Sequence, residues 1–203
     1  MSEITVGIVD YGVGNHASVL NTLKHLGFRI RVSSDRDILS QTNVLILPGV
    51  GAFPVAMEAL HKRQLTNFLR DEAKTGRPII GICLGMQLLA SSSSEVQFTE
   101  GLGLIPGKVI PLANNKWHIG WNEVQCSNDD KSFVESSGED FYFNHSYRYE
   151  GPREFQTCIS SYGEEFASVI RKDNIIGIQF HPEKSQIAGK NLLKKLIQDV
   201  TNA

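Results

Sequence analysis

A cysteine at position 83 stands between two glycines in the segment PIIGICLGMQLL. The spacing Gly81-x-Cys83-x-Gly85 matches the nucleophile elbow G-x-S-x-G, with cysteine in place of serine. An apolar, strand-like run ends at Cys83 and a helix-like run begins at Leu84, so a sharp turn would point the thiol into a cleft. The N–H groups at the start of a helix also favour the thiolate, which is the nucleophilic form. Most free cysteines are buried and inert, but the two glycines favour a nucleophile here.

A nucleophilic cysteine needs a base, usually a histidine that a third group holds in place. Among six histidines, His181 directly follows the apolar run Ile175–Phe180. A parallel strand that ended there would bring His181 to the same sheet edge as Cys83. Glu183 lies two residues further on, and Pro182 stiffens the link between them. Taken alone, His181 would more often be structural, but together with the elbow it predicts a triad of Cys83, His181 and Glu183.

The attack of a thiolate on a carbonyl also needs N–H donors for the oxyanion. The run Val44–Leu47 is followed by the glycine-rich segment PGVGA (residues 48–52), at the same predicted sheet edge. We expect one donor to be the N–H of Val50 and the other to be that of Leu84, the neighbour of the nucleophile. By itself such a segment is more often a plain turn. A metal site is not predicted, because the histidines and cysteines lack the spacing of metal ligands.

A second glycine pattern predicts a different function. Gly12, Gly14 and Ala17 fit G-x-G-x-x-G/A, the loop that holds a dinucleotide pyrophosphate at the start of a helix. Asp35 lies at the end of the next apolar run, about where a ribose-binding acid is expected. The motif alone is a weak signal, and it leaves the cysteine elbow unexplained. A dinucleotide-binding module is therefore kept as an alternative function.

The composition of the chain excludes several classes of protein. With 203 residues, 41% apolar and 21% charged, it has the material for one large core, so we expect a single domain over residues 1–203. A net charge of −2 without a basic run gives no reason to expect nucleic acid or a membrane surface as a partner. The N-terminus does not resemble a secretory signal, and the apolar stretch Pro78–Ala90 is too short to span a bilayer. A cytoplasmic location is expected, and three cysteines without paired spacing argue against a disulfide framework.

Short apolar runs alternate with helical patterns in the first half of the chain. Strands are expected at Ile4–Val9, Phe28–Ser33, Val44–Leu47 and Ile79–Cys83, with helices over Val19–Leu26 and Leu60–Ala73. Because these strands are apolar throughout, we predict an open, mostly parallel twisted sheet with helices on both faces. Added antiparallel strands are expected at Lys108–Pro111, Trp121–Gln125, Asp140–Asn144 and Phe155–Ser160. The chain would end with a buried strand and a helix, at Ile175–Phe180 and about Ile187–Val200.

With these residues in view, the chain resembles class I (triad-type) glutamine amidotransferases along nearly its whole length. Within that family it is similar to the glutaminase subunits of imidazole glycerol phosphate synthases and their close paralogues. The segments that carry the resemblance are DYGVGN, LPGVGAFPVAMEAL, GICLGMQLL, EGLGLIPGKVIPL, HIGWNEV, FYFNHSY and GIQFHPEKS. The resemblance implies a flavodoxin-like α/β fold and the hydrolysis of L-glutamine to glutamate and ammonia.

The resemblance also implies a role for each site residue. Cys83 would attack the side-chain amide of glutamine, His181 would move the protons, and Glu183 would hold His181. The N–H groups of Val50 and Leu84 would support the oxyanion. The residues at the glutamine-holding positions of the family are Gly49, Gly51, Gln87, Glu95, Ser146 and Tyr147.

A partner subunit follows from the same resemblance. The ammonia is expected to pass through a (β/α)8 cyclase, with which the chain forms a heterodimer, to give imidazole glycerol phosphate and aminoimidazole carboxamide ribotide in histidine biosynthesis. The nucleotide belongs to the partner, so no cofactor is expected on this chain.

The loop of residues 49–51 is expected to change its peptide orientation when the partner binds its ligand, which glycine makes easy. The residues expected at the interface are Gly12, Asn15, Trp121 and Lys184, which makes the opening glycine loop a docking edge rather than a cofactor site.

Three departures from the family pattern keep other functions open. The segment Asn114–Trp117 stands where a Val-Pro or Ile-Pro pair is expected, Asn144 where an apolar residue is commoner, and His16 where Leu is expected. None of these touches the predicted triad. One alternative is a paralogue that supplies ammonia for an amination step in surface-sugar synthesis. A catalytically silent scaffold and a stand-alone thiol hydrolase are the others, and the intact triad counts against silence.

Overall fold

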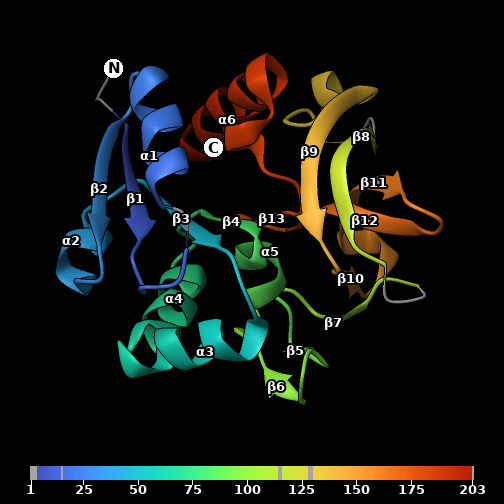
Figure 1. Cartoon of the computed structure of the whole chain (residues 1–203). Helices are drawn as coiled ribbons and strands as arrows, with labels where there is room; N and C mark the ends of the chain where they lie inside the picture. Colours follow the sequence, from blue (N-terminus) through green and yellow to red (C-terminus); the bar gives the residue numbers. More distant parts are fainter. Residues whose placement is uncertain (1–3, 15, 114–115, 128–129, 203) are drawn as a thin grey trace.

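The computed structural model of the chain describes residues 4–14, 16–113, 116–127 and 130–202 (Figure 1). Within these residues the strands form one nine-stranded and one four-stranded sheet. The larger sheet has the order β2 (Arg29–Ser33), β1 (Thr5–Val9), β3 (Val44–Gly49), β4 (Ile79–Cys83), β13 (Ile175–Ile178), β12 (Glu165–Lys172), β11 (Gln156–Ser161), β8 (His118–Cys126) and β9 (Glu139–His145). The smaller sheet has the order β10 (Tyr147–Glu150), β7 (Lys108–Pro111), β5 (Ser92–Ser93) and β6 (Thr99–Glu100).

Helices lie on both faces of the larger sheet, as Figure 1 shows. One face carries α1 (His16–His25) and α6 (Gln186–Thr201). The other carries α2 (Arg36–Ser40), α3 (Phe53–Lys62), α4 (Leu65–Lys74) and α5 (Leu84–Leu88). Short 3-10 turns lie at η2 (Val134–Ser136), η3 (Arg153–Phe155) and η4 (Pro182–Lys184). In the described parts of the chain, no helix combines the length and the apolar character that crossing a membrane requires.

Burial on both faces explains why the central strands are apolar at every position. In β3, Val44 and Ile46 pack with α1 and α6, whereas Leu45 and Leu47 pack with the helices of the opposite face. The strands from β2 to β13 pair in parallel, and those from β13 to β9 pair antiparallel. The predicted parallel sheet with helices on both faces and antiparallel strands at one side is therefore confirmed.

One predicted element is wrong. The single helix expected over Leu60–Ala73 is broken, because Gln64 has a φ of 57° and separates α3 from α4. Leu60 and Leu65 are buried on either side of this break. The apolar residues continue at helical spacing across it, so the sequence gives no indication that the helix ends here. The strands β5, β6, β10 and β12 and the helix α2 had no counterpart in the prediction, and only the end of α3 was expected. Of these, β12 matters most for the site, because it connects the parallel half of the sheet to the antiparallel half.

The prediction from the cysteine pattern is also wrong. Cys126 and Cys158 form a disulfide, contrary to the expectation from the number and spacing of the cysteines. They lie directly opposite each other on β8 and β11, with their Cα atoms 4.0 Å apart. Because 32 residues separate them in the chain, only the pairing of the two strands brings them together. The remaining cysteine, Cys83, keeps a free thiol.

Candidate active site

The turn at Cys83 has the form that the sequence predicts. The strand β4 ends at Cys83 and α5 begins at the next residue. Cys83 has φ 55° and ψ −112°, a conformation that residues other than glycine rarely adopt. Such strain persists only where the surrounding structure enforces it, and it is typical of a nucleophile held on a sharp turn. The Sγ atom lies 3.8 Å from the carbonyl oxygen of Asn144, which lines the same cavity as Cys83.

Close packing explains the two glycines of the elbow. A Cβ on Gly85 would lie 1.8 Å from the carbonyl oxygen of Leu47, and a Cβ on Gly81 would lie 2.5 Å from that of Gly85. Both neighbours are backbone atoms, which cannot swing aside as the end of a flexible side chain can. Only glycine therefore lets the end of β3 and the first turn of α5 approach the nucleophile.

Substituting Gly85 tests this packing. We expect Gly85→Ala to lower the free energy of unfolding by about 3 kcal/mol or more, as severe overpacking does, and to remove activity with it. The measurement is chemical unfolding followed by circular dichroism. Gly138→Ala is the matched control, because Gly138 has φ 85° but a Cβ there would meet nothing within 4 Å. The control should cost only the conformational strain, about 1 kcal/mol. Equal losses in the two variants would contradict the packing argument.

His181 follows β13, which pairs in parallel with β4, so it lies at the same sheet edge as Cys83. Its Nδ1 is 2.8 Å from Oε1 of Glu183, and both side chains are buried. Because a carboxylate only accepts, Nδ1 donates to Glu183 and Nε2 is left for the sulfur. Burial alone would lower the pKa of His181, but the charge and hydrogen bond of Cys83, and then those of Glu183, raise it well above its ordinary value. The raised pKa therefore favours the imidazolium form of His181 beside Cys83.

A cavity of about 370 Å³ lies over Cys83. Its walls are Val50, Gly51, Ala52, Cys83, Leu84, Gln87, Glu95, Trp117, Asn144, His145, Ser146, Tyr147, His181 and Lys184. It thus brings together most of the residues predicted to act on or hold glutamine. Gly49 is the exception, because it is buried at the end of β3, where a Cβ would lie 2.8 Å from the backbone nitrogen of Gly85. The structure places Gly49 beneath the turn of α5 and not in the cavity wall where it was predicted.

The PGVGA segment runs beside the nucleophile into α3. Gly49 is the register partner of Cys83 on the neighbouring strand, so Val50 follows at the mouth of the cavity. The carboxylate of Glu95 accepts a hydrogen bond of 2.9 Å from the N–H of Phe53, the first residue of α3. Burial raises the pKa of Glu95, and the hydrogen bond from Phe53 opposes that rise. Glu95 therefore both lines the cavity and holds the end of the PGVGA segment in place.

Two supporting side chains were not found from the sequence. Gln179 accepts a hydrogen bond of 3.1 Å from Nε2 of Gln87, which also donates to the carbonyl oxygen of Tyr147 at 3.1 Å. The hydroxyl of Tyr11 donates to the carbonyl oxygen of Pro48 at 2.7 Å and so fixes the end of β3. Burial, and after it the negative charge of Cys83, raises the pKa of Tyr11. The sequence offered one indication, namely Gln179 within the apolar run Ile175–Phe180, because an amide buried there is costly unless it is hydrogen-bonded.

Two of the departures from the family pattern contact each other. Nε1 of Trp117 donates to the side-chain oxygen of Asn144 at 2.9 Å, across the ends of β8 and β9, and both residues line the cavity. The third departure, His16, begins α1, with its Nε2 3.2 Å from the carbonyl oxygen of Val9. Asn114 and Asn115 lie outside the described residues. Trp117 and Asn144 therefore form one hydrogen-bonded part of the cavity wall, and neither belongs to the predicted triad.

The structure does not favour dinucleotide binding at the opening loop. The N–H of Gly12 donates to Oδ1 of Asp10 at 3.0 Å, so a carboxylate stands where a pyrophosphate would be held. Asp35 caps α2 by accepting a hydrogen bond of 2.8 Å from the N–H of Asp37. At the pyrophosphate position, the Asp10 carboxylate would repel the phosphates. At the ribose position, the Asp35 carboxylate is already hydrogen-bonded. The glycine pattern therefore lacks the groups that a dinucleotide needs.

Two of the predicted interface residues, Trp121 and Lys184, lie together on a surface beside the cavity. We call Ile119, Trp121, Tyr142 and Lys184 the β8–β9 face. The Trp121 and Tyr142 ring centroids are 6.1 Å apart, and Nζ of Lys184 lies 5.7 Å from the centre of the Tyr142 ring. Trp121 is 49% exposed and Ile119 is 56% exposed. Gly12 is also exposed, whereas Asn15 lies outside the described residues.

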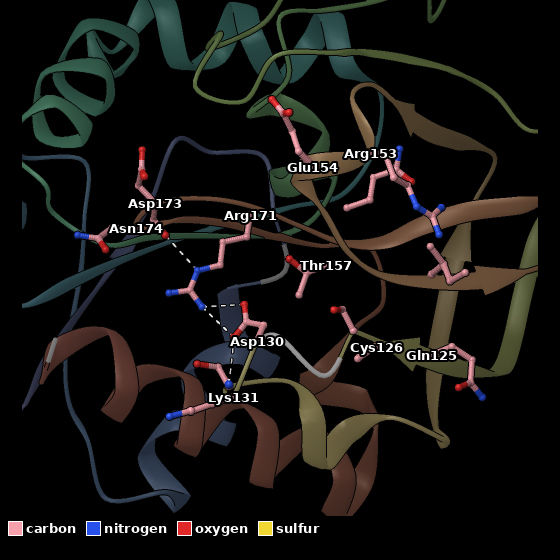
Figure 2. Close-up of a pocket in the computed structure, with 14 residues that line it drawn as sticks. Gln125, Cys126, Asp130, Lys131, Arg153, Glu154, Thr157, Arg171, Asp173 and Asn174 are labelled. Carbon is pink, nitrogen blue, oxygen red and sulfur yellow. Dashed lines mark hydrogen bonds and ion pairs between the residues drawn. The ribbon is translucent and has the colours of Figure 1, made fainter.

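A larger cavity, of about 1120 Å³, lies away from this site (Figure 2). Arg171 crosses it, donating to both carboxylate oxygens of Asp130 at 3.0 and 2.8 Å and to the carbonyl oxygen of Asp173 at 3.0 Å. The cysteine in its wall, Cys126, is in the disulfide, and no histidine is among its lining residues. The smaller cavity is the candidate active site, because it holds the free thiol and the histidine that faces it.

Comparison with known proteins places these observations in one family. Residues 7–199 match the family model described as glutamine amidotransferase class-I. The imidazole glycerol phosphate synthase subunit HisH of Listeria monocytogenes serotype 4a (strain HCC23) is 44% identical over 191 residues, which cover 92% of each chain. The subunit named HisH 2 of Vibrio vulnificus (strain YJ016) is 41% identical over 197 residues, which cover 94% of this chain and 92% of that protein. The structure of PurLQS from Thermotoga maritima has the same fold, with a TM-score of 0.76, 19% identity and 98% of each chain covered.

Proposed function

Because the chain belongs to the class-I glutamine amidotransferase family, we propose that it is the glutaminase subunit of an imidazole glycerol phosphate synthase. It hydrolyses L-glutamine to glutamate and ammonia, and the ammonia passes to a cyclase subunit for histidine biosynthesis. The observation that carries this proposal is the position of Cys83. Its thiol stands on a strained strand-to-helix turn, in one cavity with a histidine that Glu183 holds by its other nitrogen.

The geometry supports a reaction in two steps. The Cys83 thiolate adds to the carbon of the glutamine side-chain amide. The His181 imidazolium gives its Nε2 proton to the leaving nitrogen, the C–N bond breaks, and ammonia leaves a γ-glutamyl thioester. Neutral His181 then takes a proton from water as the water oxygen bonds to the thioester carbon. The C–S bond breaks, which releases glutamate and restores the thiolate and the imidazolium.

The remaining cavity residues have supporting roles in this proposal. The N–H groups of Val50 and Leu84, on either side of Cys83, stabilise the oxyanion in both steps. Glutamine is held by the other walls of the cavity, namely Gly51, Gln87, Glu95, Ser146 and Tyr147. These walls come from the loop after β3, from α5, from the segment after β5 and from the passage between β9 and β10.

The partner in this proposal is a cyclase of (β/α)8 fold that forms a heterodimer with this chain. It binds on the β8–β9 face and on the opening loop at Gly12 and Asn15. Exposed aromatic side chains with a neighbouring cation are typical of the residues that contribute most to binding at protein interfaces. This face also borders the cavity, since Lys184 belongs to both, so ammonia has a short path to the partner.

Removing the Trp121 side chain tests the docking surface. We expect Trp121→Ala to weaken binding to the cyclase by about 2 kcal/mol, or roughly thirtyfold in Kd, because a central aromatic anchor is lost. Calorimetric titration of one purified subunit with the other measures this. Ile38→Ala is the control, because Ile38 is also exposed but lies in α2, at the end of the sheet far from β8 and β9 (Figure 1). A Trp121→Ala variant that binds as tightly as this control would place the interface elsewhere.

The function itself is tested by glutaminase assays with the cyclase from the same genome. Glutamate release should rise when the cyclase and its nucleotide substrate are added, with imidazole glycerol phosphate formed in equal amount. High turnover without any partner would indicate a stand-alone hydrolase. Glutaminase activity that this nucleotide does not raise would indicate the paralogue that serves surface-sugar amination. The cytoplasmic location is also part of the proposal, and cell fractionation tests it.

A further inference from the structure

Ser146 lies where the chain passes from one sheet to the other. His145 is the last residue of β9 in the nine-stranded sheet, and Tyr147 is the first residue of β10 in the four-stranded sheet. The two proposed glutamine-holding residues, Ser146 and Tyr147, therefore sit on a bend between the sheets. On one side β7 holds it, because Tyr147 pairs with Pro111 and the N–H of Leu112 donates to the carbonyl oxygen of Ser146 at 2.9 Å. Their position depends on the groups that hold this bend.

A line of side-chain hydrogen bonds ends on the bend. Nδ1 of His145 is 2.8 Å from the carbonyl oxygen of Tyr147. Nε2 of His145 is 3.0 Å from Nδ1 of His118, its register partner on β8. Nε2 of His118 is in turn 3.3 Å from Nδ2 of Asn122, which also donates to the carbonyl oxygen of Ser161 at 2.9 Å. The line thus crosses the ends of β8 and β9 and reaches the cavity wall.

The groups at the two ends of the line determine which nitrogen carries the proton in each histidine ring. A carbonyl oxygen only accepts, so His145 carries its proton on Nδ1 and donates to Tyr147. In a neutral ring Nε2 of His145 must then accept, which makes Nδ1 of His118 the donor. His118 accepts at Nε2 from the amide of Asn122, whose second hydrogen goes to Ser161. All the donors and acceptors agree only if both histidines are neutral.

The surroundings keep both rings neutral and in place. His118 and His145 are 2% and 5% exposed. The His118 ring is stacked on Phe143 and Tyr162, with centroid distances of 4.7 and 4.2 Å. Burial lowers the pKa of His118 to about 4 and that of His145 to about 3. All four ring nitrogens are used within this line, and each ring would be costly to bury without those hydrogen bonds, so the arrangement has a role outside the proton transfers of the triad.

We propose that His118 and His145 are positioning residues for glutamine: by holding the carbonyl of Tyr147, they keep the Ser146–Tyr147 bend in the shape that binds the substrate. The inference deepens the proposed function and rests on it. Gln87, which also lines the cavity, donates to the same carbonyl oxygen at 3.1 Å, so the bend is held from the cavity side as well. Losing the histidine bond should weaken glutamine binding in the ground state and the transition state alike, because the triad is untouched.

Two substitutions at His145 separate the bond from the bulk of the ring. His145→Gln has its amide near the Nε2 position, toward His118, and loses the donor to Tyr147. His145→Asn has its amide near the Nδ1 position and keeps that donor. In the complex with the cyclase, we expect His145→Gln to raise KM for glutamine roughly tenfold with kcat within about twofold, as the loss of one buried hydrogen bond implies. His145→Asn should keep KM near that of the unchanged chain. Equal KM values in the two variants, or a loss confined to kcat, would overturn the inference.

A second measurement does not depend on the folding of any variant. Long-range ¹H–¹⁵N correlation spectra of the unchanged chain at pH 7 report the tautomer of each histidine. We expect neutral rings with the proton on Nδ1 at both His118 and His145, and the opposite tautomer at His145 would overturn the inference. The two proposals fail differently: if the unchanged complex releases no glutamate, the proposed function is wrong, whereas normal turnover with an unaltered KM in His145→Gln defeats only the positioning role.

Discussion

Glutamine hydrolysis by a Cys83→Ala variant is expected to fall by a factor on the order of 10⁴ or more, to the limit of detection. In the part of the chain that the structure describes, the cavity wall holds no second thiol to take over: besides His181 it carries amides, hydroxyls, the imidazole of His145, the ammonium of Lys184 and the Glu95 carboxylate. The measurement is glutamate release in the complex with the cyclase. Added ammonium salt should still support product formation there, because the cyclase and the interface are unchanged. Residual glutamate release near the original rate would exclude Cys83 as the nucleophile.

A second substitution at Cys83 measures the energetic cost of its backbone conformation. Cys83 has a φ of 55°, which glycine tolerates and a side chain does not. We expect Cys83→Gly to be more stable than Cys83→Ala by about 1 kcal/mol, although both are inactive. Comparing these two inactive variants removes the contribution of the sulfur. Equal stability would mean that the turn costs nothing.

For Glu183→Gln we expect kcat/KM for glutamine to fall by roughly 10²–10⁴, because the group that orients the imidazole and stabilises its charge is lost. The carboxylate of Glu183 accepts from Nδ1 of His181 at 2.8 Å, and its negative charge helps to raise the pKa of His181. A glutamine at 183 can still accept that hydrogen bond, but it carries no charge. The loss should therefore appear mainly in the protonated state of His181 and not in the fold.

The pH dependence follows from the same charges. The pKa of His181 is raised above its ordinary value, so the imidazolium and its ion pairs are fully present below that ordinary value and are lost as the pH rises through the raised one. Activity and the stability from this pair should both decline on the alkaline side. Removing the charge of Glu183 lowers the pKa, so the alkaline limb of the pH profile should move to lower pH. Profiles of kcat/KM for the unchanged chain and the Glu183→Gln variant measure this shift.

A surface carboxylate provides the control for Glu183→Gln. Glu58 lies on the exposed side of α3 and pairs with Lys62 in the next turn, far from His181 in the chain and in the fold. Glu58→Gln makes the same chemical change and should leave both the rate and the pH profile as they were. An alkaline limb that moves to higher pH in Glu183→Gln, or moves equally in the two variants, would contradict the role of Glu183.

The site could be predicted from the sequence wherever local chemistry determines local shape. The two glycines around Cys83 indicate a strand-to-helix turn, because no other residue allows the backbone atoms of Leu47 and Gly85 to come so close. The uninterrupted apolar run before His181 indicates a buried parallel strand, and the carboxyl ends of such strands meet at one edge. These patterns involve residues that are close in the chain, so they can be recognised without knowing how distant strands pair.

Only the tertiary structure decided which distant residues meet. The disulfide of Cys126 and Cys158, the bond between Trp117 and Asn144, and the line from His118 to Tyr147 all depend on the registers of β8 with β9 and β11. A shift of one residue in either register would turn these side chains to the other face. The registers are set by packing of the core and by turn lengths, which no local spacing reports. The sequence by itself therefore determined the candidate nucleophile, its candidate base and the edge where they meet, whereas the walls of the candidate cavity were decided by the pairing of strands far apart in the chain.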